Sequence, residues 1–324
     1  MAPPSIAMTQ FQRAVIAGMP RSGTTLLATH LASQAGCSFL TDYVHAFHDA
    51  AHRFKLGWQQ RLDQARRRSV LLMVRDQFLR FRHPVLVSTE DFSTLDELHR
   101  RVMAELAEQD DFVVGHKAVL EVPALQKMLA ETDVHGIIVY RDPRDAALSY
   151  WHRVGGGVEE YLERWKTIMR FVLDGPAYER FFAIRFEDLL NDRKRALEPL
   201  ATKLGLTLQE AGNKLSFRGG SAARSFGWPG NSPYQDVSRP FDTAPLERWR
   251  RMPGSPVVRY AEWLCSAEME RLGYRRGSSL SARERAAHRL RRTCHKMERG
   301  LEGSAKWMTE SVLRRVSVPL THLD

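Results

Sequence analysis

Residues 14–27 read AVIAGMPRSGTTLL, an apolar run that leads through a glycine-containing loop into a second apolar run. The β-prone segment Ala14–Ala17 ends at Gly18 and Pro20, which favour a turn over a continued strand. The apolar positions after the loop recur at helical spacing, so a helix is expected over Thr24–Ala35. A strand, a short loop and a helix in this order predict the first unit of an α/β fold.

The loop itself has the spacing of a nucleotide phosphate-binding loop. Gly18 and Gly23 enclose four residues, and the backbone N–H groups of such a loop together with the helix N-terminus bind anions. Thr24 occupies the position of the usual loop lysine, so Arg21 is the only basic side chain of the loop. The alternative is an ordinary Gly-Pro turn. The arginine and the paired threonines, Thr24 and Thr25, favour the anion site.

Strands and helices continue to alternate along the chain. The clearest buried strand is Ile137–Tyr140, and a helix is expected after it over Ala146–His152. The other expected elements are one long helix over Arg53–Arg82 and strands over Val85–Ser88, Phe112–Gly115 and Ala183–Phe186. This alternation predicts a three-layer α/β fold in which helices cover both faces of a parallel sheet.

A second polar motif follows the clearest strand. Residues 140–150 read YRDPRDAALSY, with Arg141 at the strand end and Ser149 eight residues later. The helical turn that begins at Ala146 brings Ser149 back toward the strand end. A guanidinium group at that place can bind a phosphate through two parallel hydrogen bonds. A surface loop with local salt bridges is the alternative, and the presence of both motifs in one chain argues against it.

Both motifs resemble those of the sulfotransferases that use 3′-phosphoadenosine 5′-phosphosulfate (PAPS) as their donor. The resemblance spans roughly Ala14 to Trp249, and it is specific in the two phosphate motifs alone. It implies a P-loop NTPase-like sulfotransferase fold. It also implies in-line transfer of a sulfuryl group from PAPS to an acceptor hydroxyl, with release of 3′-phosphoadenosine 5′-phosphate (PAP) and no requirement for a metal.

The resemblance also implies roles for individual residues. Arg21 would contact the bridging oxygen of the leaving phosphate, and Arg141 and Ser149 would hold the 3′-phosphate. The residues that would wrap the 5′-phosphate are Ser22, Gly23, Thr24 and Thr25. Cytosolic members of the family usually carry lysine where this chain has Arg21. Because arginine stays charged, it would stabilise negative charge here without donating a proton.

Two weaker matches add cofactor-binding candidates. Residues 184–189 resemble the aromatic-Glu-Asp strand end of the family, with Phe186 where a tyrosine is usual. The ring can still pack near the adenine, but the hydroxyl contact is lost. Arg239 precedes Pro240 in a segment similar to the late segment of tyrosylprotein-type sulfotransferases, where a basic residue closes over the cofactor. A plain surface arginine is the alternative for Arg239.

The catalytic base is assigned by position. Sulfuryl transfer needs a group that accepts the proton of the acceptor hydroxyl. Cytosolic family members use a histidine at a fixed distance before the 3′-phosphate arginine, and that position holds Val119 here, two residues after Lys117. Protein-tyrosine members instead carry a glutamate at a fixed step beyond the loop basic residue, and the same step from Arg21 reaches Asp42.

Asp42 is therefore the first candidate for the base, and His116 is the second. His45 and His48 are more remote candidates. The alternative for Asp42 is a turn or helix-cap residue, and the alternative for the histidines is packing or solvation.

Two other functions remain open at this point. A P-loop kinase of a small hydroxyl compound would need a loop lysine and a carboxylate for magnesium, which the motifs lack. A non-catalytic nucleotide-binding scaffold would keep the motifs without the chemistry. The acceptor has no recognisable sequence code, so a lipid, a glycan, a peptide and a phenolic metabolite are all candidates.

Composition gives the cellular setting. Cys37, Cys265 and Cys294 form no close pair, which favours a reducing compartment, and no apolar run is long enough to cross a membrane. The N-terminal residues lack the apolar core of a signal peptide, so the cytoplasm is the expected location. The formal net charge is +10, and its distribution does not indicate nucleic acid.

The chain divides into a sulfotransferase domain, residues 1–274, and a basic C-terminal extension, residues 275–324. The extension carries twelve Lys or Arg against five Asp or Glu. Apolar residues recur along it at helical steps, which predicts an amphipathic helix. Packing on the domain is the favoured interpretation of this helix, and a homodimer or a peripheral membrane contact is the alternative.

Overall fold

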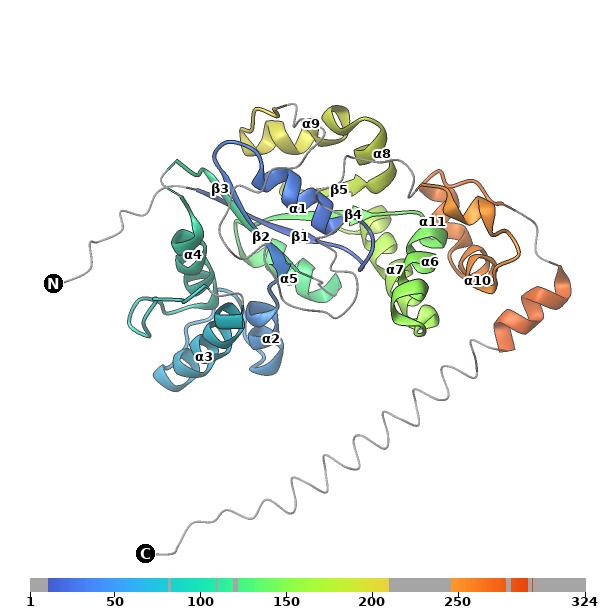
Figure 1. Ribbon diagram of the computed structural model, residues 1–324. Coiled ribbons are helices and arrows are strands. Elements are labelled where there is room, and N and C mark those ends of the chain that lie inside the picture. Colours follow the sequence, from blue (N-terminus) through green and yellow to red (C-terminus); the bar gives the residue numbers. More distant parts are fainter. Residues whose placement is uncertain are drawn as a thin grey trace, which may run out of the picture.

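The computed structural model describes residues 11–80, 83–108, 110–118, 122–209, 246–277, 281–290 and 293, apart from the side chains of residues 41 and 42. Five parallel strands form one sheet in the order β2-β3-β1-β4-β5 (Figure 1). Their bounds are β1 Gln12–Ala17, β2 Cys37–Tyr43, β3 Val113–Lys117, β4 His135–Tyr140 and β5 Phe181–Arg185. The order reverses at β1, which lies at the centre of the sheet.

Helices cover both faces of this sheet. One face packs against α1 (Thr24–Ala32), α8 (Phe186–Asn191) and α9 (Arg193–Leu204). The other face packs against α4 (Leu95–Leu106), α5 (Val122–Glu131) and α7 (Val158–Asp174). The sequence prediction of a three-layer α/β fold is therefore confirmed.

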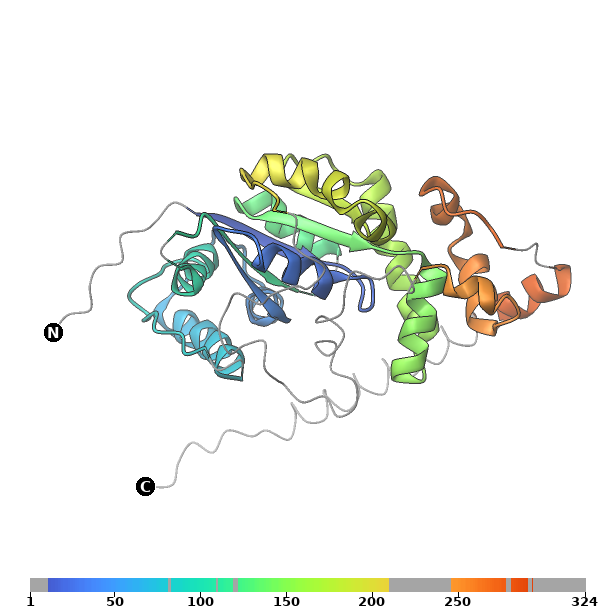
Figure 2. The same ribbon diagram turned by 45° about the horizontal axis from the view of Figure 1, so that its top comes forward.

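The remaining helices lie at the two ends of the sheet. Helices α2 (Ala46–Arg53) and α3 (Gln64–Arg80) lie beside α4, next to β2. Helices α6 (Pro143–Val154), α10 (Pro256–Leu264) and α11 (Ser266–Arg271) lie at the opposite end, with the short 3-10 helix η2 (Arg248–Arg251) beside α6. Figure 2 shows the same separation from a second direction.

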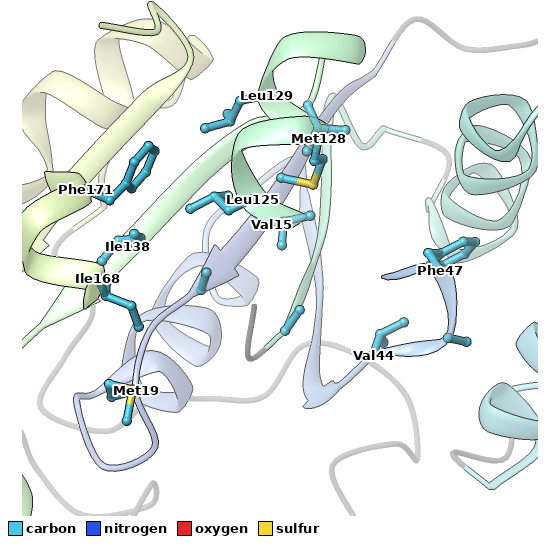
Figure 3. Packing of buried hydrophobic residues seen from close by; sticks show 14 of the residues in the cluster. Val15, Met19, Val44, Phe47, Leu125, Met128, Leu129, Ile138, Ile168 and Phe171 are labelled. Atoms are coloured by element: carbon cyan, nitrogen blue, oxygen red, sulfur yellow. The ribbon is translucent and has the colours of Figure 1, made fainter. Parts of the chain in front are cut away.

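The central strand explains why both faces must be covered. Its residues are buried on either side, with Val15 facing the α4/α5/α7 layer and Ile16 facing the α1/α8/α9 layer. A continuous apolar run of this kind is typical of a parallel strand that is buried on both faces. Figure 3 shows Val15 among side chains of the larger core, including Leu125, Met128 and Ile138.

The structure corrects the expected strand Val85–Ser88, which is irregular backbone. Side chains satisfy its polar groups in place of a neighbouring strand. Arg75 Nε donates to the Val85 carbonyl oxygen at 3.2 Å, and its Nη2 donates to that of Val87 at 2.7 Å. The Leu86 N–H donates to the Glu105 carboxylate at 3.0 Å. The segment was predicted from its apolar composition alone, which does not supply a ladder partner.

The single long helix expected over Arg53–Arg82 is also wrong. Helix α2 ends where that helix was expected to begin, and α3 starts only at Gln64. Lys55 adopts a left-handed φ of 53°, a conformation that ends a helix rather than continuing it. The strand β2 was not predicted, and it contains the backbone of Asp42, so the turn interpretation of this residue is wrong.

A buried ion-pair network joins α6 to residues near the C-terminal end of the described fold. The guanidinium of Arg144 donates to Asp142 at 2.7 Å and to Glu262 at 2.9 Å, and it lies 3.4 Å from the centre of the Trp249 ring. Glu262 also accepts the N–H of Gly277 at 2.7 Å. Because a buried charge without its partners is strongly destabilising, these contacts fix α10 and η2 against α6.

The described part of the C-terminal extension contacts α10. Residues 282–290 are helical, and Glu284 accepts a hydrogen bond from Arg259 Nε at 3.1 Å. His288 packs against the rings of Tyr260 and Trp263. Leu290 is exposed, and the apolar positions from Cys294 onward lie outside the described residues. The boundary at residue 274 stays a prediction.

Candidate functional site

The candidate site lies at the carboxyl end of the sheet, where ligands bind in open α/β folds. All five strands deliver a side chain or a loop to this edge. Strand β1 leads into the phosphate loop, and the residues at or directly after the ends of the other strands are Tyr43, Lys117, Arg141 and Phe186. Residues far apart in sequence therefore meet at one place because parallel strands end on the same side.

Two glycines allow the phosphate loop to fold as it does. Gly18 adopts φ 149°, and a Cβ at this position would collide with the Val139 carbonyl oxygen on β4. Gly23 adopts φ 97°, and a Cβ there would collide with the ring of Phe186. Arg21 itself has a left-handed φ of 72°, which strains a residue with a side chain. Backbone of alternating handedness is the geometry that gathers N–H groups into an anion-binding concavity.

The structure brings the two phosphate motifs into direct contact. Arg21 Nε donates to Ser149 Oγ at 3.0 Å, and Arg141 Nη1 donates to the Arg21 carbonyl oxygen at 3.3 Å. Tyr161 donates its hydroxyl to the Pro20 carbonyl oxygen at 2.8 Å, and the Trp165 indole N–H donates to the Arg141 carbonyl oxygen at 3.0 Å. Two aromatic side chains of α7 therefore hold the phosphate loop and the second motif in place through hydrogen bonds to their backbones.

The arginines of the two motifs concentrate positive charge. Burial lowers the pKa of Arg21, and the nearby charges of Arg153 and Arg141 lower it further. Burial also lowers the pKa of Arg141, while Asp145, 3.8 Å from its guanidinium, acts in the opposite direction. Positive groups that are desolvated and repel one another are stabilised by a bound anion. The electrostatics therefore favour an anionic ligand between these side chains.

Lys117 adds a third cation at the loop. Its ammonium donates to Thr25 Oγ1 at 2.7 Å and lies 3.9 Å from the centre of the Tyr43 ring. The Tyr43 hydroxyl is 3.5 Å from Thr24 Oγ1. Lys117 belongs to β3 rather than to the loop, yet its charge reaches the first turn of α1. The pair of threonines therefore sits between a lysine and a tyrosine from neighbouring strands.

Phe186 closes the site on the side of β5. Its ring lies 4.7 Å from the guanidinium carbon of Arg141 and directly against Gly23. The ring is buried, and it links the loop to the second motif. Ser22 is buried within the loop. Together these contacts bring the candidate cofactor-binding residues of the two motifs and Phe186 to one place.

Two predicted site residues cannot be placed by their side chains. Arg239 lies outside the described residues, and so does the side chain of Asp42. The backbone of Asp42 lies in β2 immediately before Tyr43, where the pairing with β3 shifts register between Leu40 and Tyr43. Asp42 is therefore at the correct edge of the sheet, and its role as the base stays a prediction.

His116 lies on the face of β3 opposite Lys117, because successive side chains of a strand alternate. It is fully buried, and its Nε2 lies 3.0 Å from His99 Nε2. Burial lowers the pKa of His116 to about 4. The side chain thus points away from Thr25 and the phosphate loop, a placement that does not favour proton transfer from an acceptor there.

His45 is nearer to the loop than the other candidate histidines. Its ring stacks on Tyr43 with 5.8 Å between the ring centres. Burial lowers the pKa of His45, Asp49 raises it, and the charge of Lys117 lowers it. His48 is buried against Trp58 in the same core as His116. The test of the base must therefore include His45.

The buried histidines predict a loss of stability in acid. Burial lowers the pKa of His48 to about 3, that of His116 to about 4, and that of His99 well below 6.5. The unfolded chain binds protons below pH 6.5 and the folded chain does not, so the free energy of unfolding decreases as the pH falls from about 6.5 toward 4. Each pKa unit corresponds to about 1.4 kcal/mol.

Urea unfolding at a series of pH values measures this slope. His48→Met removes one of these groups and should make the decrease shallower, whereas His52→Gln, at an exposed position, should leave it unchanged. An identical slope in His48→Met and the wild type would contradict the assignment.

Two residues of the site carried no signal in the sequence. Tyr43 follows Asp42 at the end of an unpredicted strand, and Tyr161 lies on α7, twenty residues after Arg141. Neither belongs to a motif with a known spacing. Their position becomes evident only when the strand ends are brought together.

Within the described ranges, no cluster of three or more His, Cys, Asp or Glu side chains could hold a metal ion. None of the helices over the same ranges is long and apolar enough to cross a bilayer. The side chains that meet at the phosphate loop are mainly cationic or hydroxyl-bearing, which suits phosphate oxygens.

Comparisons with known proteins bear on the fold and the family of this chain. Among solved structures, the chain resembles the sulfotransferase domain from the olefin synthase of Synechococcus PCC 7002, with 15% identity and a TM-score of 0.55 over 83% of this chain and 97% of that chain. A sulfotransferase domain from the curacin biosynthetic pathway is 14% identical, with a TM-score of 0.48 over 82% of this chain and 99% of that chain. No curated protein matches the chain in sequence.

A sequence model of the sulfotransferase family matches residues 14–210, which is more than half of the chain. The match includes the phosphate loop, Lys117, Arg141, Ser149 and Phe186. The olefin synthase domain shares the fold. The chain therefore belongs to the sulfotransferase family.

Proposed function

We propose that this protein transfers a sulfuryl group from PAPS to an acceptor hydroxyl and releases PAP. The observation that carries the proposal is the contact between the two phosphate motifs, in which Arg21 Nε donates to Ser149 Oγ and Arg141 Nη1 donates to the Arg21 carbonyl oxygen. A nucleotide with phosphates on both its 5′ and its 3′ position requires two cationic sites that lie close together. A nucleoside triphosphate requires one site and a metal.

The residues fit such a donor. The strained loop around Arg21 and Gly23 supplies backbone N–H groups for a 5′-phosphate, and Lys117 adds a charge beside Thr25. Arg141 and Ser149 are the groups for a 3′-phosphate. The ring of Phe186 offers a flat apolar surface next to Arg141. Desolvation of the two arginines raises the electrostatic benefit of binding an anion.

In the reaction, the acceptor oxygen forms a bond to sulfur as the bond between sulfur and the bridging phosphate oxygen breaks. The hydroxyl proton passes to a base, for which Asp42 is the first candidate. Negative charge grows on the leaving phosphate. Arg21 and Lys117 are the cations placed to stabilise that charge, and a preorganised cation contributes most where charge develops.

The proposal is tested by titration calorimetry with PAP and with ATP, each with and without magnesium. We expect tighter binding of PAP than of ATP, with no dependence on magnesium. Incubation with PAPS and a panel of alcohols, phenols, glycans and lipids, followed by mass spectrometry, would identify the acceptor class. Tighter binding of ATP, or strict magnesium dependence, would overturn the donor assignment. PAP binding without turnover of any acceptor would favour a nucleotide-binding scaffold.

Arg141→Ala should weaken PAP binding by roughly 1.5–3 kcal/mol, because a charge-assisted hydrogen-bonded contact to the 3′-phosphate is lost. Calorimetry measures the loss. The melting temperature must be followed in parallel, because Asp145 loses its ion pair in this variant. Arg195→Ala, on the exposed side of α9, is the matched control and should bind PAP as the wild type does. Equal affinities in the two variants would remove Arg141 from the phosphate site.

A further inference from the structure

Two exposed leucines lie on α3 and a third lies on the segment that α3 holds through Arg75. Leu72, Leu79 and Leu86 are 66%, 68% and 76% exposed, respectively. Leu72 and Leu79 are seven residues apart on the helix, so they lie on the same face. Figure 1 shows α3 at the periphery of the molecule, beyond α2 and α4.

Arg75 joins the third leucine to the other two. It lies three residues after Leu72 and four before Leu79, which places it between them on the helix face. Its guanidinium donates to the carbonyl oxygens on either side of Leu86, at 3.2 Å and 2.7 Å. Val85 and Val87 are buried while Leu86 points outward. Arg75 therefore connects the region of Leu72 and Leu79 to that of Leu86, and we call these three exposed leucines the leucine patch.

Positive charge predominates along α3 beside the leucine patch, although the carboxylate of Glu105 accepts the N–H of Leu86 at 3.0 Å. Residues 61–80 contain six arginines and two aspartates. Both aspartates are engaged by neighbours on the helix or its start, Asp63 by Arg66 and Asp76 by Arg80. Arg75 donates to neutral carbonyl oxygens and also interacts electrostatically with Glu105, whereas Arg68 is exposed one turn before Leu72. Exposed leucines flanked by arginines are typical of a surface that binds an anionic membrane. The leucines insert among the apolar lipid chains, and the arginines contact the anionic headgroups.

We propose that the leucine patch docks this protein on an anionic lipid surface. A second copy of the chain is disfavoured as the occupant, because a two-fold interface through the patch would bring two surfaces of the same positive charge together. The C-terminal extension is disfavoured for the same reason, since it carries twelve basic residues against five acidic ones. Phospholipid headgroups such as phosphatidylserine supply the complementary charge.

Hydrogen bonds connect α3, which carries two leucines of the patch, to the end of β2 at the candidate site. Gln77, on the inner side of α3, accepts the N–H groups of His45 and Ala46 at 2.8 Å and 2.7 Å, and donates to the Tyr43 carbonyl oxygen at 3.2 Å. These residues follow directly on β2. Docking through α3 would therefore hold the end of β2, where the candidate base Asp42 lies, near the bilayer. This step rests on the proposed function, and it favours an acceptor that is presented at a membrane.

The test is sedimentation of the full chain with lipid vesicles. We expect binding to phosphatidylcholine vesicles that contain about one third phosphatidylserine, weak binding to phosphatidylcholine alone, and a decrease with added salt. The triple variant Leu72→Ser/Leu79→Ser/Leu86→Ser should reduce the partition coefficient by roughly tenfold or more, because each leucine contributes buried apolar area. Arg68→Glu should also reduce it.

Two exposed residues elsewhere serve as controls. Met252→Ser and Leu290→Ser remove exposed apolar side chains outside the patch and should bind vesicles as the wild type does. An unchanged partition coefficient in the triple variant, or no wild-type binding, would overturn the proposal. Loss of binding in Leu290→Ser instead would move the contact to the C-terminal extension. A wild-type dimer in light scattering that the triple variant dissociates would make the patch an interface between copies.

PAP binding separates this inference from the proposed function. The triple variant should bind PAP with wild-type affinity, which shows that the fold is intact. A wild type that binds vesicles without binding PAP would sustain the docking surface and remove the proposed donor.

Discussion

Arg21→Ala should lower the turnover number roughly a hundredfold or more, whereas the affinity for PAP should fall much less. Negative charge on the leaving phosphate grows only as the sulfur–oxygen bond breaks, so the guanidinium is most valuable in the transition state. The Nε–Ser149 hydrogen bond and the partial burial of Arg21 hold the guanidinium in position before the reaction. Single-turnover kinetics at saturating PAPS, paired with calorimetry of PAP, measure the two effects separately.

Two variants are controls for this result. Arg21→Lys keeps a charge in the loop and should retain more activity than Arg21→Ala. Arg153→Ala removes an exposed charge that acts on Arg21 through space, and its effect on turnover should be small. Equal losses of affinity and turnover in Arg21→Ala would show that the arginine only binds the donor.

Asp42→Asn should lower turnover by roughly two to four orders of magnitude, the usual contribution of a general base. The amide has almost the shape of the carboxylate but cannot accept the proton of the acceptor hydroxyl. Asp42 is assigned as the base by its position, because it lies near the carboxyl end of β2, immediately before Tyr43. PAP affinity and the melting temperature should remain close to those of the wild type. The rate is measured with any acceptor found in the mass-spectrometric panel.

Histidine variants are the counter-test. His116→Asn should have the milder effect, because the ring is buried beside His99 on the far side of β3. His45→Gln should also be milder, although its ring stacks on Tyr43. A near-wild-type rate for Asp42→Asn together with an inactive His45→Gln or His116→Asn would transfer the role to that histidine.

The parts of this protein that sequence predicted are those specified locally. The phosphate loop was predicted from the spacing of Gly18, Arg21 and Gly23. All three residues have positive φ values, which glycine adopts readily and Arg21 adopts with strain. The second motif follows from the eight-residue step between Arg141 and Ser149. Each signal lies within one strand-loop-helix unit, so no knowledge of distant contacts is required. The parallel three-layer sheet follows from the repetition of such units.

The parts that sequence did not predict depend on distant side chains. Val85–Ser88 has a strand-like composition, but Arg75 and Glu105 satisfy its polar groups, so no sheet forms there. Strand β2 ends in polar residues and has only a short apolar run, and its pairing with β3 establishes it. Tyr161 reaches Pro20 from a helix whose periodicity indicates only which side is buried.

The buried guanidinium of Arg144 has a consequence for recombination between relatives. The family match ends at residue 210, yet this cation needs Glu262 and Trp249, which lie beyond that point. A hybrid that joins the first 210 residues of this chain to the remainder of a relative keeps Asp142 but lacks the other two partners of Arg144 unless the relative supplies both. Arg144, Trp249 and Glu262 are therefore expected to be exchanged as one set, and the natural crossover point lies before α6 rather than after the matched region.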